Sequence, residues 1–259
     1  MFAKYLIDMN LHNRRFATIL TAILTIICII NIYSSSYAQT DHSLGNWNGM
    51  LLKGKISPRW SLLGEAHIRS TNYNLKYDYF EVKTGIYYSF TKKLTGLIGT
   101  GFYNTDQPGE LFQTPALQKE FRTWLELSFK QKFNRFNFDH RVRVEQRFIP
   151  NNYKNRMKYR LALMLPITRA ELIPGCIYLS LNDELWMPQH GVVVEKNRLY
   201  AGLGYKLNGN TALQAGCVND NSYSIHINDN SYNTHDHLVK NYLQIMMIYN
   251  FERRVAKHI

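Results

Sequence analysis

Apolar and charged residues alternate with a period of two along much of this chain, most clearly over residues 120–148. In EFRTWLELSFKQKF (120–133) the odd positions are mostly apolar and the even positions mostly charged. In FNFDHRVRVEQRF (136–148) the parity is reversed. A period of two is the side-chain repeat of a β-strand, so each segment predicts a strand with one apolar and one charged face. Asn134-Arg135 is short enough to join them as an antiparallel hairpin.

Pairing Phe133 with Phe136 sets the register of this hairpin. Three charged pairs then lie opposite one another: Glu126 with Arg143, Lys130 with Asp139, and Arg122 with Arg147. Opposite charges across a ladder contribute roughly 0.2–1 kcal/mol each, so the first two pairs favour this register. The two arginines of the third pair have Glu120 and Glu145 as diagonal neighbours.

The length of these strands separates two interpretations of the apolar face. A soluble sandwich buries this face, whereas a membrane barrel turns it toward lipid. Twelve steps from Phe121 to Phe133 span about 40 Å at roughly 3.3 Å per residue, or roughly 30 Å along the membrane normal at a tilt of about 40°. Soluble strands are usually about 5–6 residues long, so a membrane barrel is the better interpretation.

The same alternation predicts further strands on both sides of this hairpin. The eleven predicted strands are 47–56, 60–69, 78–90, 94–103, 120–133, 136–148, 156–167, 176–186, 197–207, 211–218 and 238–251. Short and long connections alternate between them, with residues 149–155 and 219–237 among the long polar loops. The predicted fold is all-β, an antiparallel transmembrane β-barrel of about 10–12 strands. Such barrels normally have an even number of strands, so either the first segment is not a wall strand, which gives ten, or the alternation misses one strand, which gives twelve. Twelve is favoured.

The N-terminus has the three parts of a Sec-type signal peptide. Lys4, Arg14 and Arg15 form a basic region, residues 16–30 are an unbroken run of Thr and apolar residues, and Ser36-Tyr37-Ala38 is a small-x-small cleavage site. A membrane anchor is the rival interpretation, but the run is shorter than the roughly 18–20 residues that a span needs. We therefore expect a signal peptide at 1–38, a mature barrel at 39–259, and location in the outer membrane of a Gram-negative bacterium.

Three segments of this pattern resemble a known family: EFRTW (120–124), RVRVEQRF (141–148) and RMKYRL (156–161). They resemble a domain-of-unknown-function family of Gram-negative, Bacteroidetes-type outer-membrane β-barrel proteins, over residues 47 to about 251. The resemblance implies the fold and the location. It implies no catalytic residues.

The inward positions of the predicted barrel are rich in charge. The predicted lumen-lining residues are Glu65, Glu81, Lys83, Glu120, Arg122, Glu126, Lys130, Asp139, Arg141, Arg143, Glu145, Arg147, Arg156, Lys158, Arg160, Glu184 and Arg198. On the three strands between 120 and 167, nine inward basic residues (Lys132 included) face four acidic ones. This excess predicts either an anion-favouring pore or a lumen filled by salt-bridged side chains.

The sequence contains candidate residues for two other kinds of site, an enzyme active site and a metal site. A lipid hydrolase or acyltransferase of the outer leaflet needs a serine beside a histidine. His67 near Glu65, His140, Ser128 and Ser180 are the candidates, and no G-x-S-x-G pattern accompanies them. The segment 219–237 contains possible metal ligands, Asp220, His226, Asp229, His235, Asp236 and His237, at a spacing that matches no known site.

The sequence thus predicts a non-catalytic outer-membrane barrel that is either structural or a narrow pore for small polar or anionic solutes. A lipid-modifying enzyme is the alternative. The net charge of +12 suits anionic partners, namely outer-membrane lipids, lipopolysaccharide or small anionic solutes. Nucleic acid is not expected as a partner of an exported chain, and no cofactor or metal is expected. The sequence leaves the oligomeric state open.

Overall fold

The structure is a computed structural model that describes residues 39–72, 76–107, 109, 111, 116–190, 193–228 and 231–252. The predicted signal peptide lies outside the described residues. No helix within these ranges is long and apolar enough to cross a membrane.

Eleven strands make up the described fold. They are β1 (Gln39–Lys55), β2 (Trp60–Ser70), β3 (Tyr79–Ser89), β4 (Leu94–Thr105), β5 (Gln118–Phe133), β6 (Phe136–Ile149), β7 (Asn152–Pro166), β8 (Ile177–Pro188), β9 (Lys196–Lys206), β10 (Thr211–Asn228) and β11 (Ser231–Glu252). Every strand predicted from the alternation is present. The largest differences in length are in β1, β10 and β11.

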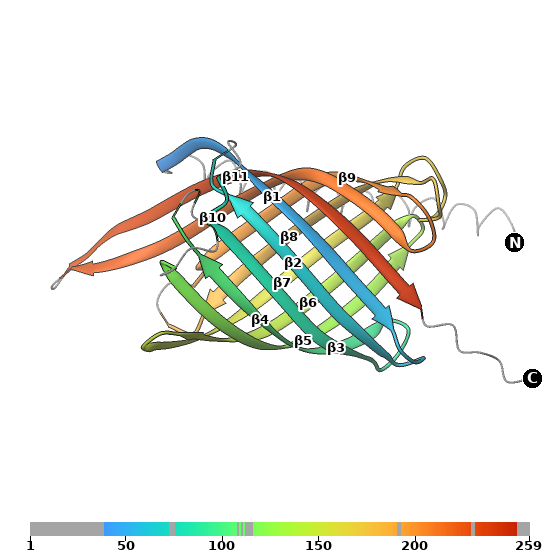
Figure 1. Ribbon diagram of the computed structural model, residues 1–259, viewed down its shortest axis with the longest axis horizontal. Helices are drawn as coiled ribbons and strands as arrows, with labels where there is room; N and C mark the ends of the chain where they lie inside the picture. Colours follow the sequence, from blue (N-terminus) through green and yellow to red (C-terminus); the bar gives the residue numbers. More distant parts are fainter. Residues whose placement is uncertain are drawn as a thin grey trace, which may run out of the picture. The chain divides into compact units, whose positions relative to one another are not determined.

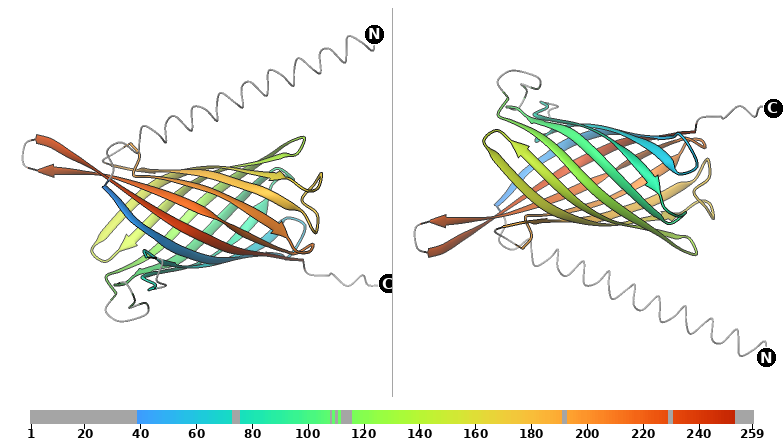
Figure 2. Two further views of the ribbon diagram at one scale, coloured as in Figure 1. Left: turned by 90° about the horizontal axis from the view of Figure 1, so that it is seen from above. Right: turned by 90° about the horizontal axis from the view of Figure 1, so that it is seen from below.

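The strands close into one barrel in which each strand pairs with its neighbours in sequence and β1 pairs with β11 (Figures 1 and 2). Consecutive strands are antiparallel, so an odd number of them requires β1 and β11 to run in the same direction. Figure 1 shows their arrows pointing the same way. A side chain at Gly45 would meet Tyr242, and nine residues further along both strands a side chain at Gly54 would meet Phe251. This parallel closure allows an odd number of strands, so the preference for twelve is wrong.

The β5–β6 hairpin has the predicted register. Phe133 pairs with Phe136, Glu126 with Arg143, Lys130 with Asp139, and Arg122 with Arg147. Asn134 adopts a positive φ of 51°, which a two-residue hairpin turn requires and which asparagine tolerates better than most residues. The Glu126–Arg143 ion pair and the turn chemistry therefore specify the same alignment, whereas Lys130 and Asp139 lie opposite each other without forming an ion pair within 4.0 Å.

Two of the predicted long loops are strands. Only residues 150–151 separate β6 from β7, and β10 and β11 continue through most of 219–237 as a ribbon that projects past the rest of the barrel (Figure 1). Conversely, residues 167–176 form a longer connection at the end where short turns were predicted. Beyond the apolar band both faces of a hairpin can be polar, so the alternation that marks a strand is lost although the backbone still pairs.

The barrel is apolar outside and polar inside, the reverse of a soluble protein. Ile98, Phe102 and Leu125 are 69%, 63% and 61% exposed on the outer wall, whereas Glu145 inside is 0% exposed. Small apolar clusters, such as Leu63 with Leu97 and Trp124, interrupt the charged interior. The charged side chains therefore occupy the place of a hydrophobic core.

Candidate functional site

The lumen contains a cavity of about 590 Å³ whose lining reaches both ends of the barrel. Lys53, Thr95 and Lys130 line it near the ends of β1, β4 and β5 that adjoin short turns, and Gln118 and Glu195 line it at the opposite end. Thirteen basic side chains contribute to the lining: Lys53, Arg69, Lys83, Arg122, Lys130, Arg141, Arg143, Arg147, Arg156, Lys158, Arg160, Lys196 and Arg198. Seven acidic side chains do so: Glu65, Glu81, Glu120, Glu126, Asp139, Glu184 and Glu195.

The structure places sixteen of the seventeen predicted lumen residues on this lining, and the exception, Glu145, lies fully buried beneath it. Lys132, which the parity of β5 also assigns to the interior, lies instead at the barrel end. Its Nζ is 2.8 Å from Glu171 Oε1, and both side chains are exposed. The strand has passed the end of the lumen at this position, which alternation alone does not reveal.

Glu145 on β6 is the most enclosed charge of the site. Its Oε2 accepts a hydrogen bond of 2.7 Å from Lys158 Nζ, and its Oε1 accepts one of 2.7 Å from Arg156 Nε. Arg122 and Arg143 approach the same carboxylate at 3.6 Å and 4.0 Å. One acid thus joins four cations from β5, β6 and β7.

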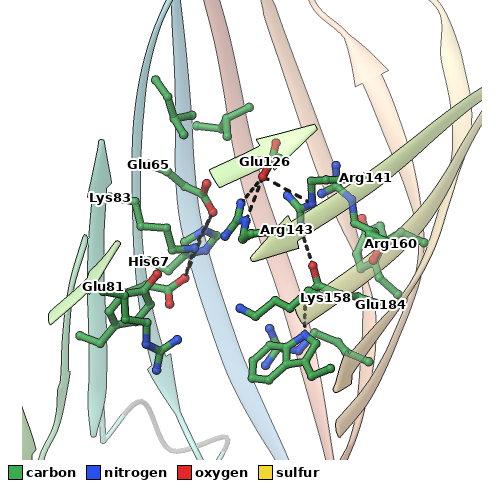
Figure 3. Close-up of a pocket in the computed structure, with 18 of the residues that line it drawn as sticks. Glu65, His67, Glu81, Lys83, Glu126, Arg141, Arg143, Lys158, Arg160 and Glu184 are labelled. Atoms are coloured by element: carbon green, nitrogen blue, oxygen red, sulfur yellow. Dashed lines mark hydrogen bonds and ion pairs between the residues drawn. The ribbon is translucent and has the colours of Figure 1, made fainter. Parts of the chain in front are cut away.

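A second group connects β5, β6 and β8. Glu126 Oε2 accepts from Arg143 Nη2 at 2.6 Å and lies 3.7 Å from Arg141 Nε. Arg141 also donates to Glu184, whose other oxygen accepts from Trp186 Nε1 at 2.7 Å. The planar guanidinium groups link acids on strands that are not adjacent, which a lysine would do less well. Figure 3 shows Glu126, Arg141, Arg143 and Glu184 pointing into the cavity.

A third group lies on β2 and β3 and contains the arrangement closest to a metal site. Ligand atoms of Glu65, His67 and Glu81 lie within 4.8 Å of one another. However, Lys83 Nζ is 2.8 Å from Glu65 and 2.6 Å from Glu81, so an ammonium already occupies the position between the two acids. The indole of Trp47 donates to His67 Nδ1 at 3.0 Å. The neutral ring therefore carries its proton on Nε2, toward Glu65, and offers no lone pair there. This group is best described as a salt-bridge cluster.

The fourth group was missed by the sequence reasoning because Lys196 and Asp220 fall in segments that were assigned to loops. Asp220 Oδ2 accepts from Lys196 at 3.1 Å and from Arg198 at 3.0 Å. The Arg198 guanidinium lies between two indole rings, 4.5 Å from the centroid of Trp47 and 4.7 Å from that of Trp186. Cation–π contacts of this kind stabilise a desolvated arginine. Asp220 is thus a partner for lumen cations, which argues against its predicted candidacy as a metal ligand.

Some cations of the lumen have no acid partner. In the part of the chain that the structure describes, Lys53, Lys130 and Arg160 form no ion pair within 4.0 Å, and Lys53 lies 4.3 Å over the ring of Tyr87. Thirteen cations on the lining exceed its seven acids, and Glu145 and Asp220 beneath it only partly offset the difference. The cavity consequently has a positive potential.

The described residues bring no serine to a histidine. His67 contacts Trp47 and Glu65, and His140, on the outer wall, accepts or donates a hydrogen bond of 2.9 Å with Tyr159. Ser128 donates to Glu126 at 3.4 Å inside the lumen. The pairing expected for the enzyme alternative is therefore not formed among these candidates.

The comparison with known families covers most of this barrel. Residues 44–231 match the family described as "Protein of unknown function (DUF2490)". The chain belongs to this family. The match contains the hairpin 120–148 and every residue of the four charged groups of the lumen. No curated protein and no solved structure matches the chain.

Proposed function

We propose that this DUF2490 protein is an outer-membrane β-barrel of a Gram-negative bacterium, exported by the Sec pathway and active as its mature chain, 39–259. The exposed apolar wall supports this proposal, because such a surface is stable only against lipid. Aromatic contacts form a belt across one end of four strands. Phe102 lies 5.0 Å from Phe121, Phe121 lies 5.9 Å from Phe148, and Phe148 lies 5.3 Å from Tyr153. Aromatic girdles of this kind mark membrane–water interfaces.

The proposed role of the lumen is a narrow, non-catalytic passage for small anions. The observation that carries this proposal is a single cavity whose lining reaches both barrel ends and has nearly twice as many basic as acidic side chains. Rings of Arg and Lys favour anions in a pore and exclude cations electrostatically. A cavity of about 590 Å³ spread over the length of the lumen suits small inorganic or carboxylate anions rather than large solutes.

The cations without acid partners would attract the permeating ion. Lys53 and Lys130 lie at one end of the cavity, and Arg160 lies deeper on β7. Arg143, in contrast, is held by Glu126 through two hydrogen bonds. We assign the cations that form ion pairs with acids to stabilising the barrel wall. We assign the cations without such ion pairs to selecting the solute.

A chloride-efflux assay tests this role. Lipid vesicles containing the refolded chain are loaded with KCl, and the loss of chloride is followed with and without the potassium carrier valinomycin. An anion-selective pore releases chloride several-fold faster with valinomycin, because potassium must leave by another route. The Lys130→Gln/Arg160→Gln variant should lose much of this release, whereas Lys132→Gln, at the exposed pair outside the lumen, should not.

Two results would contradict the proposal. Release that does not depend on valinomycin would indicate a pore that also passes potassium. No release from a barrel that floats with the vesicles and shows heat-modifiable mobility would indicate a closed, structural barrel.

A further inference from the structure

The outer wall of the barrel has two different sides. On β4–β7 the outward residues near one end form the aromatic belt from Phe102 to Tyr153. On β8–β11 polar and apolar residues share the outward positions between the middle of β8 and this same end, and Leu185 and Leu199 are among the apolar ones. Six of these outward positions are polar: Asp183, Asn197, Asn219, Asn221, His237 and Asn241. We call these six residues the amide patch.

Hydrogen bonds connect the amide patch across the strands. Asn221 Nδ2 donates to Asn219 Oδ1 at 2.5 Å, and Asn219 Nδ2 donates to Asn241 Oδ1 at 2.9 Å. His237 Nε2 and Asn221 Oδ1 are 3.1 Å apart. Asn221 pairs with Asn197 in the β9–β10 ladder, so the patch is continuous from β8 to β11.

Asp183 places a carboxyl group within the apolar wall. It is the seventh of the twelve residues of β8, and its neighbours across the two ladders are Leu161 and Leu199. Its Oδ1 accepts from Asn197 Nδ2 at 2.5 Å. Ionisable groups that face hydrocarbon are costly and are usually covered by protein or water. Since this argument depends on the proposed membrane location, it applies only if the barrel is embedded in lipid.

We propose that the amide patch is the contact surface between two copies of this chain in the membrane. A two-fold interface requires a surface that is complementary to itself. Amide side chains meet this requirement because each has both donors and acceptors. The Asn241 amide nitrogen donates no hydrogen bond within the described residues, and the Asp183 carboxylate, with about four acceptor sites, receives only one side-chain donor there. A two-fold rotation can therefore place donors of β11 against acceptors of β8.

Energy transfer between two labelled populations tests this proposal in a bilayer. The label is attached to Gly209→Cys in a Cys217→Ser background. A side chain at Gly209 would meet nothing within 4 Å, and the other cysteine, Cys176, is buried. Donor- and acceptor-labelled chains are mixed and reconstituted at low density. Energy transfer between the donor and acceptor labels can be detected over a distance as large as the width of such a dimer. The result therefore does not depend on where the two-fold axis lies.

The dimer predicts efficient transfer that falls when unlabelled chain is added. Replacing Asp183, Asn219 and Asn241 by leucine should abolish the transfer. The matched control is Thr123→Val/Gln146→Leu, which removes an outward polar pair bonded at 3.0 Å on the aromatic side and should leave the transfer intact. Heat-modifiable mobility shows that each variant has folded.

Three outcomes overturn the dimer: no transfer in the parent chain, transfer that survives the triple substitution, or a monomer that carries a tightly bound glycolipid in native mass spectrometry. Vesicle flotation and chloride efflux are measured on the same samples. A monomer that floats and releases chloride refutes only this inference, whereas a barrel that does not float refutes the proposed function.

Discussion

Glu126 and Arg143 face each other across the β5–β6 ladder, and two hydrogen bonds of 2.9 Å and 2.6 Å join Nε and Nη2 of the arginine to one carboxylate oxygen. Both side chains are buried in the lumen. A pair of this kind does two things at once: it fixes the register of the hairpin and it neutralises a charge that has left bulk water.

Glu145→Gln should destabilise the barrel strongly. The carboxylate is 0% exposed and contacts Arg122, Arg143, Arg156 and Lys158. Removing one partner of a buried ion pair costs about 3–5 kcal/mol because the remaining charges lose their compensation. Urea unfolding of the barrel in lipid vesicles measures the change. Glu171→Gln, in the exposed pair with Lys132, is the control and should leave the midpoint unchanged. Equal midpoints for the two variants would contradict the role assigned to Glu145.

Trp186→Ala should widen the passage. The indole ring lies 4.1–5.1 Å from the cationic groups of Arg156, Lys158, Lys196 and Arg198, so it occupies the lumen and holds Arg198 in place. Removing a large buried side chain such as this one also lowers the free energy of unfolding by about 3–5 kcal/mol. Single-channel recording should show a larger conductance. The control is Trp60→Ala on the exposed outer wall, which should have the same conductance as the parent chain. If Trp186→Ala also has the parent's conductance, the indole of Trp186 does not narrow the passage.

Lys83→Ala should create a binding site for divalent zinc that the parent chain lacks. The ammonium of Lys83 lies between Glu65 and Glu81, and its removal leaves two carboxylates beside His67. Because Trp47 donates to His67 Nδ1, a metal on Nε2 must also displace or reorient that indole contact, and Trp47→Phe should tighten binding further. Calorimetric titration with zinc measures both effects. Lys83→Ala/His67→Ala should bind no zinc, and zinc binding by the parent chain would refute the salt-bridge assignment.

Gly49→Val should disturb packing at the parallel β1–β11 seam. A side chain at Gly49 would lie 2.6 Å from Met246 Sδ on β11 and also meet the His67 ring, so both of these side chains would have to move. The refolding yield, read as the heat-modifiable band in gel electrophoresis, should fall sharply. Gly209→Ala, which would meet nothing within 4 Å, should refold as the parent does. Normal refolding of Gly49→Val would show that the seam is not closely packed.

The strands and the β5–β6 register could be predicted because the period of two and the charge pairs are local in sequence. Glu126 and Arg143 are seventeen residues apart on one hairpin, so their pairing follows once the turn is placed. Arg141 and Glu184 could not be paired in this way, since the contact skips β7 and depends on how steeply the strands tilt. The cation–π position of Arg198 similarly depends on Trp47, which becomes its neighbour only when the barrel closes.

The errors have a common cause. Residues 219–222 are polar on both faces, so the alternation is interrupted there, and it resumes only with Tyr223, Ile225 and Ile227. The whole segment nevertheless pairs with β11 and brings Asp220 to Arg198. The eleven-strand count conflicted with the usual even number until the parallel β1–β11 pair was seen. Periodicity in the sequence marks the apolar face of a strand, and it carries little information where both faces are polar.

The most direct test of the central claim is the reversal potential of the mature chain in a planar lipid bilayer under a tenfold KCl gradient. The excess of basic side chains on a lining that reaches both ends predicts discrete openings whose current reverses close to the chloride equilibrium potential. A reversal potential on the potassium side would contradict the account, and so would the lack of openings from barrels that have inserted and folded.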